Sequence, residues 1–167
     1  MCDPIISGFP EDELDAEVLH RKFLQEYPDA SESINPNLPP AVYNKLPSSI
    51  FLNSDHAHDM VTRRSITGLL IFVGRTPVHA ISKRQGAVET SMYGAEFAAM
   101  KMAIEEAIAM RYMLRCLGVY VEHTTRIYGD NAGVILNATI PSSLLKKKHV
   151  ALSYHMTREA VASGIAK

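Results

Sequence analysis

The fold of this 167-residue chain is decided by residues 48–118, whose sequence is SSIFLNSDHAHDMVTRRSITGLLIFVGRTPVHAISKRQGAVETSMYGAEFAAMKMAIEEAIAMRYMLRCLG. They open with three short runs rich in apolar and β-branched residues, at 48–55, 66–73 and 77–82. Polar or Gly/Pro segments of hairpin length separate the three runs. The pattern predicts three consecutive antiparallel strands.

A long helix is predicted after these strands, from about Ser91 to Leu117. Thr90 or Ser91 supplies the N-cap, and Gly118 ends the helix. The residues that recur at helical spacing, and so predict the face packed on the sheet, are Met100, Ala103, Ala107, Met110 and Leu114. Glu96 lies at the N-terminal end of the same face. A carboxylate is unexpected there.

The rest of the chain predicts one more strand and two more helices. A short strand at 126–128 runs into Gly129 and Asp130, and a helix follows at about 131–138. The segment 146–164, KKKHVALSYHMTREAVASG, predicts the last helix. The order is three strands, helix, strand, helix, helix, which is typical of an α/β fold with a mixed sheet flanked by helices.

The first 47 residues differ from the remainder and are predicted to be an acidic, proline-rich connector, with the domain at 48–167. They hold seven of the nine prolines. One short helix is predicted at 11–27, with Leu14, Val18 and Leu19 on one face, and residues 34–47 are predicted to be an extended tether. Residues 1–50 carry nine acids and three bases, a net charge of −6, whereas residues 51–167 carry nine acids and fourteen bases, a net charge of +5. The two parts therefore have different electrostatic roles.

Composition excludes several classes of protein. Apolar residues make up 47% of the chain and charged residues 21%, which argues against intrinsic disorder. Cys2 and Cys116 are too few for a disulfide framework or a zinc ribbon. The longest apolar run, 69–73, is far shorter than the roughly 18 residues of a membrane span. The acidic N-terminal stretch does not resemble a secretory signal. These features predict a soluble intracellular protein, with no membrane partner.

Three acids mark a candidate metal centre. Asp55 ends the first strand, Glu96 lies in the first turns of the long helix, and Asp130 follows the fourth strand. Carboxylates close together repel unless protons or cations neutralise them, and Mg²⁺ prefers carboxylate oxygens. Each acid also has a simpler interpretation. Asp55 could form an Asx-type turn, Asp130 could cap the next helix, and Glu96 could be solvated near the positive end of the helix dipole.

Four motifs resemble the ribonuclease H region of copia-type LTR retrotransposon polyproteins. They are the Ser-Asp-His-Ala opening at 54–57, the Thr-Arg-Arg-Ser-x-Thr-Gly hairpin at 62–68, the Glu-Thr-Ser-x-x-Gly-Ala-Glu-Phe helix start at 89–97 and the Gly-Asp-Asn turn at 129–131. The resemblance covers about residues 50–164. Residues before it resemble the connector that follows the reverse transcriptase in such polyproteins.

This resemblance implies a ribonuclease H-like fold and hydrolysis of the RNA strand of RNA–DNA hybrids with two Mg²⁺ or Mn²⁺ ions. Asp55, Glu96 and Asp130 match three of the family's four metal-binding acids. The fourth acid belongs to a Pro-Ala-Asp-like segment that follows a further strand, and the chain ends at Lys167, so we expect the last strand and helix to be missing and cleavage to be reduced. His58 stands where relatives commonly have glycine, and Ala151 stands where many have aspartate.

The resemblance also implies contacts with nucleic acid. The residues expected along the substrate path are Arg63, Arg64, Ser65, Thr90, Ser91 and Asn131. Lys146, Lys147 and Lys148 could bind phosphates or form a solvated charged face. Expected partners are the hybrid and the reverse transcriptase portion of a polyprotein, in the cytoplasm, in a virus-like particle or in the nucleus. A non-catalytic remnant that binds nucleic acid or protein is the alternative function, and an exposed sheet edge is expected to favour self-association.

Overall fold

A computed structural model describes residues 13–167 except residues 45, 122–123, 144 and 146–149, and it leaves undescribed the side chains of residues 13–17 and 19. The elements in chain order are α1 (Glu13–Glu26), β1 (Ser48–Asp55), β2 (Ile66–Val73), β3 (Thr76–Arg84), α2 (Met92–Cys116), β4 (Arg126–Tyr128), α3 (Ala132–Thr139) and α4 (Ala151–Ala162). The predicted strands and helices are all present. None of the described helices is long and apolar enough to cross a membrane.

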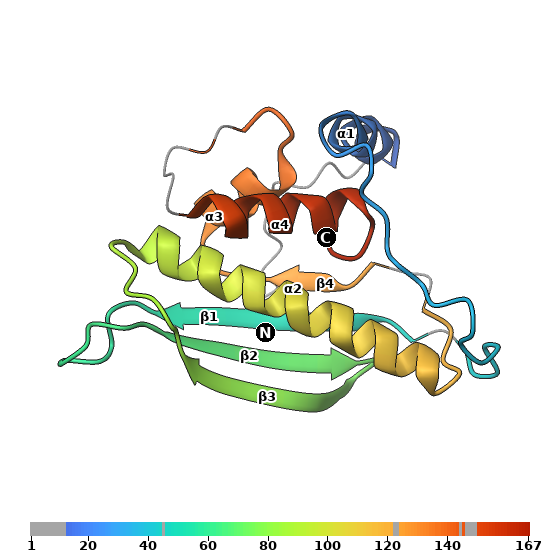
Figure 1. The fold of residues 1–167 in the computed structure, drawn as a ribbon, viewed down its shortest axis with the longest axis horizontal. Helices are drawn as coiled ribbons and strands as arrows, with labels where there is room; N and C mark the ends of the chain where they lie inside the picture. Colours follow the sequence, from blue (N-terminus) through green and yellow to red (C-terminus); the bar gives the residue numbers. More distant parts are fainter. Residues whose placement is uncertain (1–12, 45, 122–123, 144, 146–149) are drawn as a thin grey trace.

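The four strands form one mixed sheet in the order β3-β2-β1-β4 (Figure 1). β1 pairs antiparallel with β2, and β2 pairs antiparallel with β3. β4 pairs parallel with β1, so that Phe51 lies beside Tyr128. The prediction of three antiparallel strands followed by a parallel one is confirmed. The carboxyl ends of β1 and β4 therefore lie at the same end of the sheet.

The core lies between the sheet and α2, which crosses β1 and β2 in Figure 1. Side chains alternate along β1, with Ile50 and Leu52 buried and Phe51 exposed between them. Phe97 and Met100 of α2 are buried against this face. Ser91 caps α2 by accepting a hydrogen bond from the Gly94 amide (3.2 Å), as predicted. This packing points the first turns of α2 at the carboxyl end of β1.

The last residues of the chain add a short pairing to β4. Ala166 forms a parallel bridge with Thr125. The amide of Ile127 donates to the carbonyl of Lys167 (2.8 Å), and the amide of Lys167 donates to the carbonyl of Thr125 (3.0 Å). Among the described residues no strand follows α4, and residues 165–167 form only this bridge and backbone hydrogen bonds with residues 125–127. They cover part of the edge expected to be exposed.

The described part of the N-terminal segment packs on the domain and is not a free tether. α1 lies beside α4 (Figure 1), and Phe23 of α1 is buried beneath the guanidinium of Arg158, 4.8 Å from its ring centroid. Arg158 also binds the carboxylate of Glu26. Val18, predicted on the buried face, is exposed. Leu14 and Leu19 lie outside the described side chains. The contacts that attach α1 to the domain are thus made by Phe23 and Glu26, which the helical spacing of apolar residues did not identify.

Glu32 forms a second attachment between the acidic segment and the domain. Its carboxylate accepts hydrogen bonds from Arg111 (2.8 and 2.7 Å) and from Arg115 (2.6 and 2.7 Å), both on α2. Burial by itself would raise the pKa of Glu32, but the hydrogen bonds from the two arginines outweigh it and lower the pKa to about 2. Further along, the amides of Val42 and Tyr43 donate to the carbonyl of Gly118.

Acid is expected to weaken the attachment at Glu32. A carboxyl whose pKa is lowered on folding stabilises the fold fully above its unfolded pKa, near 4.5, and loses that contribution as the pH falls towards 2. We expect Glu32→Gln to lower the free energy of unfolding by about 2 kcal/mol at pH 6, with a smaller difference from wild type at pH 3. Urea denaturation at both pH values measures this. Glu159→Gln, at an exposed position of α4, is the control. An equal difference at both pH values would contradict the assignment.

Candidate metal centre

The three predicted acids lie on elements that meet at one end of the sheet. Asp55 is the last residue of β1, and Asp130 lies two residues after β4. Because Phe51 pairs with Tyr128, the parallel register continued by two residues brings Asp130 level with Asn53. Gly129 keeps this approach close, since a Cβ there would lie 3.2 Å from Cδ1 of Leu52.

Glu96 forms the buried part of the site. It is only 5% exposed, so the interpretation of a solvated Glu96 is wrong. Its Oε1 accepts a hydrogen bond from the Ser54 amide at 3.0 Å, whereas its buried Oε2 has no hydrogen-bond partner among the described residues. Burial and, next, the charge of Asp130 raise the pKa of Glu96 to about 7, and the hydrogen bond from Ser54 opposes this rise. The carboxyl of Glu96 therefore lies close enough to Asp130 for the charge of Asp130 to raise its pKa.

Asp55 and Asp130 are both exposed. The Oδ2 of Asp55 lies 2.5 Å from Nδ1 of His58 in the loop after β1. Asp130 does not cap α3, because the N-cap is Asn131, whose side chain accepts from the Val134 amide at 3.2 Å. The capping interpretation of Asp130 is wrong. The carboxylate of Asp130 is therefore not used in capping α3.

The donor set fits a hard divalent cation. Carboxylate oxygens are the ligands that Mg²⁺ and Mn²⁺ prefer, and the unpartnered buried Oε2 of Glu96 is an acceptor that lacks a donor or a cation. In the described part of the chain, no three His, Cys, Asp or Glu side chains are gathered closely enough to hold an ion. Binding by all three acids would therefore require the exposed Asp55 and Asp130 to turn towards Glu96.

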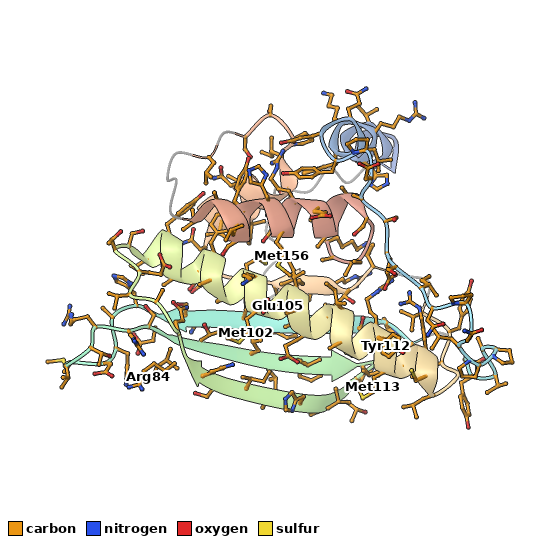
Figure 2. The ribbon with its side chains drawn as sticks, in the orientation of Figure 1. Arg84, Met102, Glu105, Tyr112, Met113 and Met156 are labelled. Atoms are coloured by element: carbon orange, nitrogen blue, oxygen red, sulfur yellow. The ribbon has the colours of Figure 1, made fainter. Side chains whose placement is uncertain are left out.

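The loop between β1 and β2 carries the basic residues nearest in sequence to Asp55. Asp59 organises it by accepting from the amides of Val61 (2.9 Å) and Thr62 (3.0 Å) and by pairing with Arg84 (3.0 Å), which Figure 2 labels near the end of β3. Arg63 is exposed with a φ of +58°, and Arg64 is half-buried. The loop that follows Asp55 therefore exposes the cationic side chain of Arg63.

Other predicted contact residues have structural roles. Ser65 is fully buried, and its hydroxyl accepts from the Ala57 amide at 3.1 Å, so it shapes the loop and does not face outward. Ser91 and Asn131 cap α2 and α3, respectively, while Thr90 is exposed beside the first of these caps. Lys146, Lys147 and Lys148 lie outside the described residues.

Sequence reasoning missed one residue of this region, Gln85. It is buried directly after β3, and its amide nitrogen donates to the carbonyl of Ala95 at 2.9 Å, next to Glu96. Strand and helix periodicities give no signal for such a residue, because it lies between the two elements. Only its position after a strand could have drawn attention to it.

Two curated proteins are similar to this chain in sequence. The retrovirus-related Pol polyprotein from transposon RE2 of Arabidopsis thaliana is 31% identical over 121 residues, and that from transposon RE1 of the same plant is 29% identical over 121 residues. Each match covers 72% of this chain but only 8% of the polyprotein, so the chain spans a small part of these relatives. No family model matches the chain.

Two solved structures are similar in fold. Ribonuclease H1 from the halophilic archaeon Halobacterium salinarum has a TM-score of 0.53 at 12% identity, over 72% of this chain and 80% of that one. A ribonuclease H1 isolated from compost by a metagenomic approach has a TM-score of 0.52 at 14% identity, over 72% of this chain and 82% of that one. Identities this low show a shared fold and nothing further.

Proposed function

We propose that this chain, which has the ribonuclease H fold and is homologous to a segment of transposon Pol polyproteins, hydrolyses the RNA strand of RNA–DNA hybrids with divalent cations. The observation that carries the proposal is the buried Glu96, whose Oε2 has no partner in the described part of the chain and lies at the end of the sheet where Asp55 and Asp130 are placed. The copia type of element and a neighbouring reverse transcriptase are parts of the same proposal.

Each acid contributes differently to the proposed reaction. Glu96 offers a fixed ligand oxygen, because the Ser54 amide holds its other oxygen. Asp55 and Asp130 bring exposed carboxylates to the same end of the sheet. The bound cation would activate a water molecule and stabilise the charge that develops on the phosphodiester. The three acids supply a limited negative charge, so we expect slow turnover and a requirement for a high Mn²⁺ concentration.

The loop after β1 supports binding of the hybrid. Arg63 is exposed there, and Arg64 lies beside it. Their guanidinium groups fit phosphate oxygens of a nucleic-acid backbone and carry no base specificity. Recognition by backbone contacts suits a nuclease that acts on hybrids of any sequence.

Cleavage of a hybrid with end-labelled RNA tests the proposal. We expect the purified chain to cut the RNA strand in Mn²⁺, more slowly in Mg²⁺, and to stop when EDTA removes the metal. Duplex DNA and single-stranded RNA of the same sequence are the control substrates, and we expect both to remain intact. Binding of the hybrid without any cleavage across the Mn²⁺ range would instead support the non-catalytic binding module.

A further inference from the structure

The buried side-chain amide of Gln85 contacts three elements. They are β1, which carries Asp55, β2, which pairs with β1, and α2, which carries Glu96. Gln85 is 6% exposed, and its backbone amide donates to the carbonyl of Ser65 at 2.8 Å. Because Gln85 directly follows β3, this bond ties its backbone to the start of β2. This backbone hydrogen bond therefore fixes the position of Gln85 independently of its side-chain contacts.

The side-chain nitrogen of Gln85 meets three acceptors. Nε2 lies 2.9 Å from Oγ1 of Thr67 on β2 and 2.9 Å from the carbonyl oxygen of Ala95 on α2. A third contact, 3.4 Å long, reaches Oγ of Ser54 on β1. Because a carbonyl oxygen only accepts, the contact with Ala95 requires the nitrogen and not the oxygen of the amide at this position. The amide thus links β1, β2 and α2.

The linked atoms stand beside the candidate ligands. Ser54 precedes Asp55, and Ala95 precedes Glu96. The amide of Ser54 also donates to Oε1 of Glu96 at 3.0 Å. Gln85 and Ser54 therefore connect the end of β1 to the first turns of α2.

We propose that Gln85 is a positioning residue that holds the first turns of α2 against the end of β1, and thereby fixes Glu96 at the end of the sheet where Asp55 and Asp130 are placed. This inference rests on the proposed function. Carboxylates that face one another repel, so their elements separate unless other bonds hold them. The bonds from Nε2 of Gln85 to β2 and α2 are short, buried and directed at fixed backbone or hydroxyl groups, which makes them suited to that task.

Gln85→Met tests the positioning role, because methionine fills a similar volume but donates no hydrogen bond. We expect its Mn²⁺ affinity, measured without nucleic acid by electron paramagnetic resonance of free Mn²⁺, to be at least about tenfold lower than that of wild type. Thr157→Val is the matched control. It removes a buried hydrogen bond to the carbonyl of Ser153 within α4 (2.7 Å) and no contact of Gln85, so we expect its Mn²⁺ affinity to stay within about twofold of wild type.

A second variant and a second measurement guard against misfolding. In Gln85→Glu the hydroxyls of Thr67 and Ser54 can rotate to donate to the new carboxylate, whereas the carbonyl of Ala95 cannot. Amide hydrogen exchange of the metal-free protein should therefore become faster in the first turns of α2, with β2 and the C-terminal half of α2 unchanged.

The outcomes separate the two proposals. Equal Mn²⁺ affinity of wild type and Gln85→Met, or unchanged exchange in the first turns of α2 in Gln85→Glu, overturns the positioning role and leaves the proposed function standing. An equal loss of affinity in Thr157→Val and Gln85→Met assigns the effect to stability and also overturns the positioning role. Absence of Mn²⁺ binding to wild type overturns both proposals.

Discussion

Replacing Asp130 with asparagine is expected to reduce Mn²⁺-dependent cleavage of a labelled hybrid by at least about 10³-fold. The substitution keeps the size of the side chain and removes its charge. A bound metal contributes several kcal/mol to the stabilisation of a hydrolytic transition state, and about 4 kcal/mol corresponds to about 10³-fold in rate. Single-turnover cleavage with excess protein measures the loss.

The same variant has a readout that needs no metal. The charge of Asp130 is the second cause, after burial, of the raised pKa of Glu96. In Asp130→Asn the pKa of Glu96 should therefore fall below its present value of about 7, and it should stay above 4.5 because burial remains. Carbon-13 NMR of the glutamate carboxyl groups during a pH titration measures this change.

Glu105→Gln is the matched control for Asp130→Asn. Glu105 is exposed on α2, labelled in Figure 2, and forms an ion pair with Lys101 at 3.5 Å. The control makes the same change of charge away from the ends of β1 and β4, so cleavage and the titration of Glu96 should match wild type. Unchanged cleavage in Asp130→Asn would refute its role as a metal ligand.

Replacing Arg158 with methionine is expected to destabilise the fold by about 3–5 kcal/mol, because three backbone carbonyls lose their donor and each buried acceptor left unsatisfied costs about 1–3 kcal/mol. Arg158 is fully buried. Its Nη1 donates to the carbonyls of Asn137 (3.0 Å) and Ile140 (2.8 Å), and its Nη2 donates to the carbonyl of Pro141 (2.7 Å) and to Glu26. Methionine would leave these acceptors without their donor.

The loss should exceed that of breaking the ion pair alone. Arg158 joins α4 to the turn after α3 and to α1, and its guanidinium stacks on Phe23 and Tyr154. Glu26→Gln removes the charge but keeps an amide oxygen that can accept from Nη2, and Arg158 keeps its backbone carbonyl acceptors. We therefore expect Glu26→Gln to cost less than Arg158→Met, about 1.5–3 kcal/mol. Urea denaturation monitored by circular dichroism compares the two variants.

Arg126→Met is the control for the loss of a positive charge. Arg126 is exposed on β4, and a surface substitution of this kind is expected to change the free energy of unfolding by no more than about 0.5 kcal/mol. A similar midpoint for Arg158→Met and Arg126→Met would show that the buried guanidinium does not hold the helices together.

Local patterns predicted the elements and the positions of the acids. The alternation of apolar residues in 48–55 and the helical spacing of apolar residues after Ser91 each indicate one buried face. These two faces pack against each other in the core between the sheet and α2. Glu96 was identified because it interrupts an apolar stripe. The predicted helix at 131–138 and strand at 126–128 differ from the structure by at most a residue or so at their ends.

Those local patterns could not predict contacts between residues that are far apart in the sequence. Prolines and acidic residues predicted a connector at 1–47 but not its contacts with the domain, in which Glu32 binds two arginines on α2, some 80 positions along the chain, and Glu26 binds Arg158. The numbers of acidic and basic residues do not indicate which acid forms an ion pair with which base. The pairing of residues 165–167 with β4 likewise depends on where α4 ends in space.

By itself, the sequence of this chain determined its strands, its helices and the three acids, because hydrophobic periodicity and turn residues act within a few positions of the chain. The tertiary structure alone decided that Glu96 is buried beside Ser54, that Asn131 and not Asp130 caps α3, and that Gln85 joins three elements. These features depend on distances and solvent exclusion between residues far apart in the chain, which only the packed fold sets.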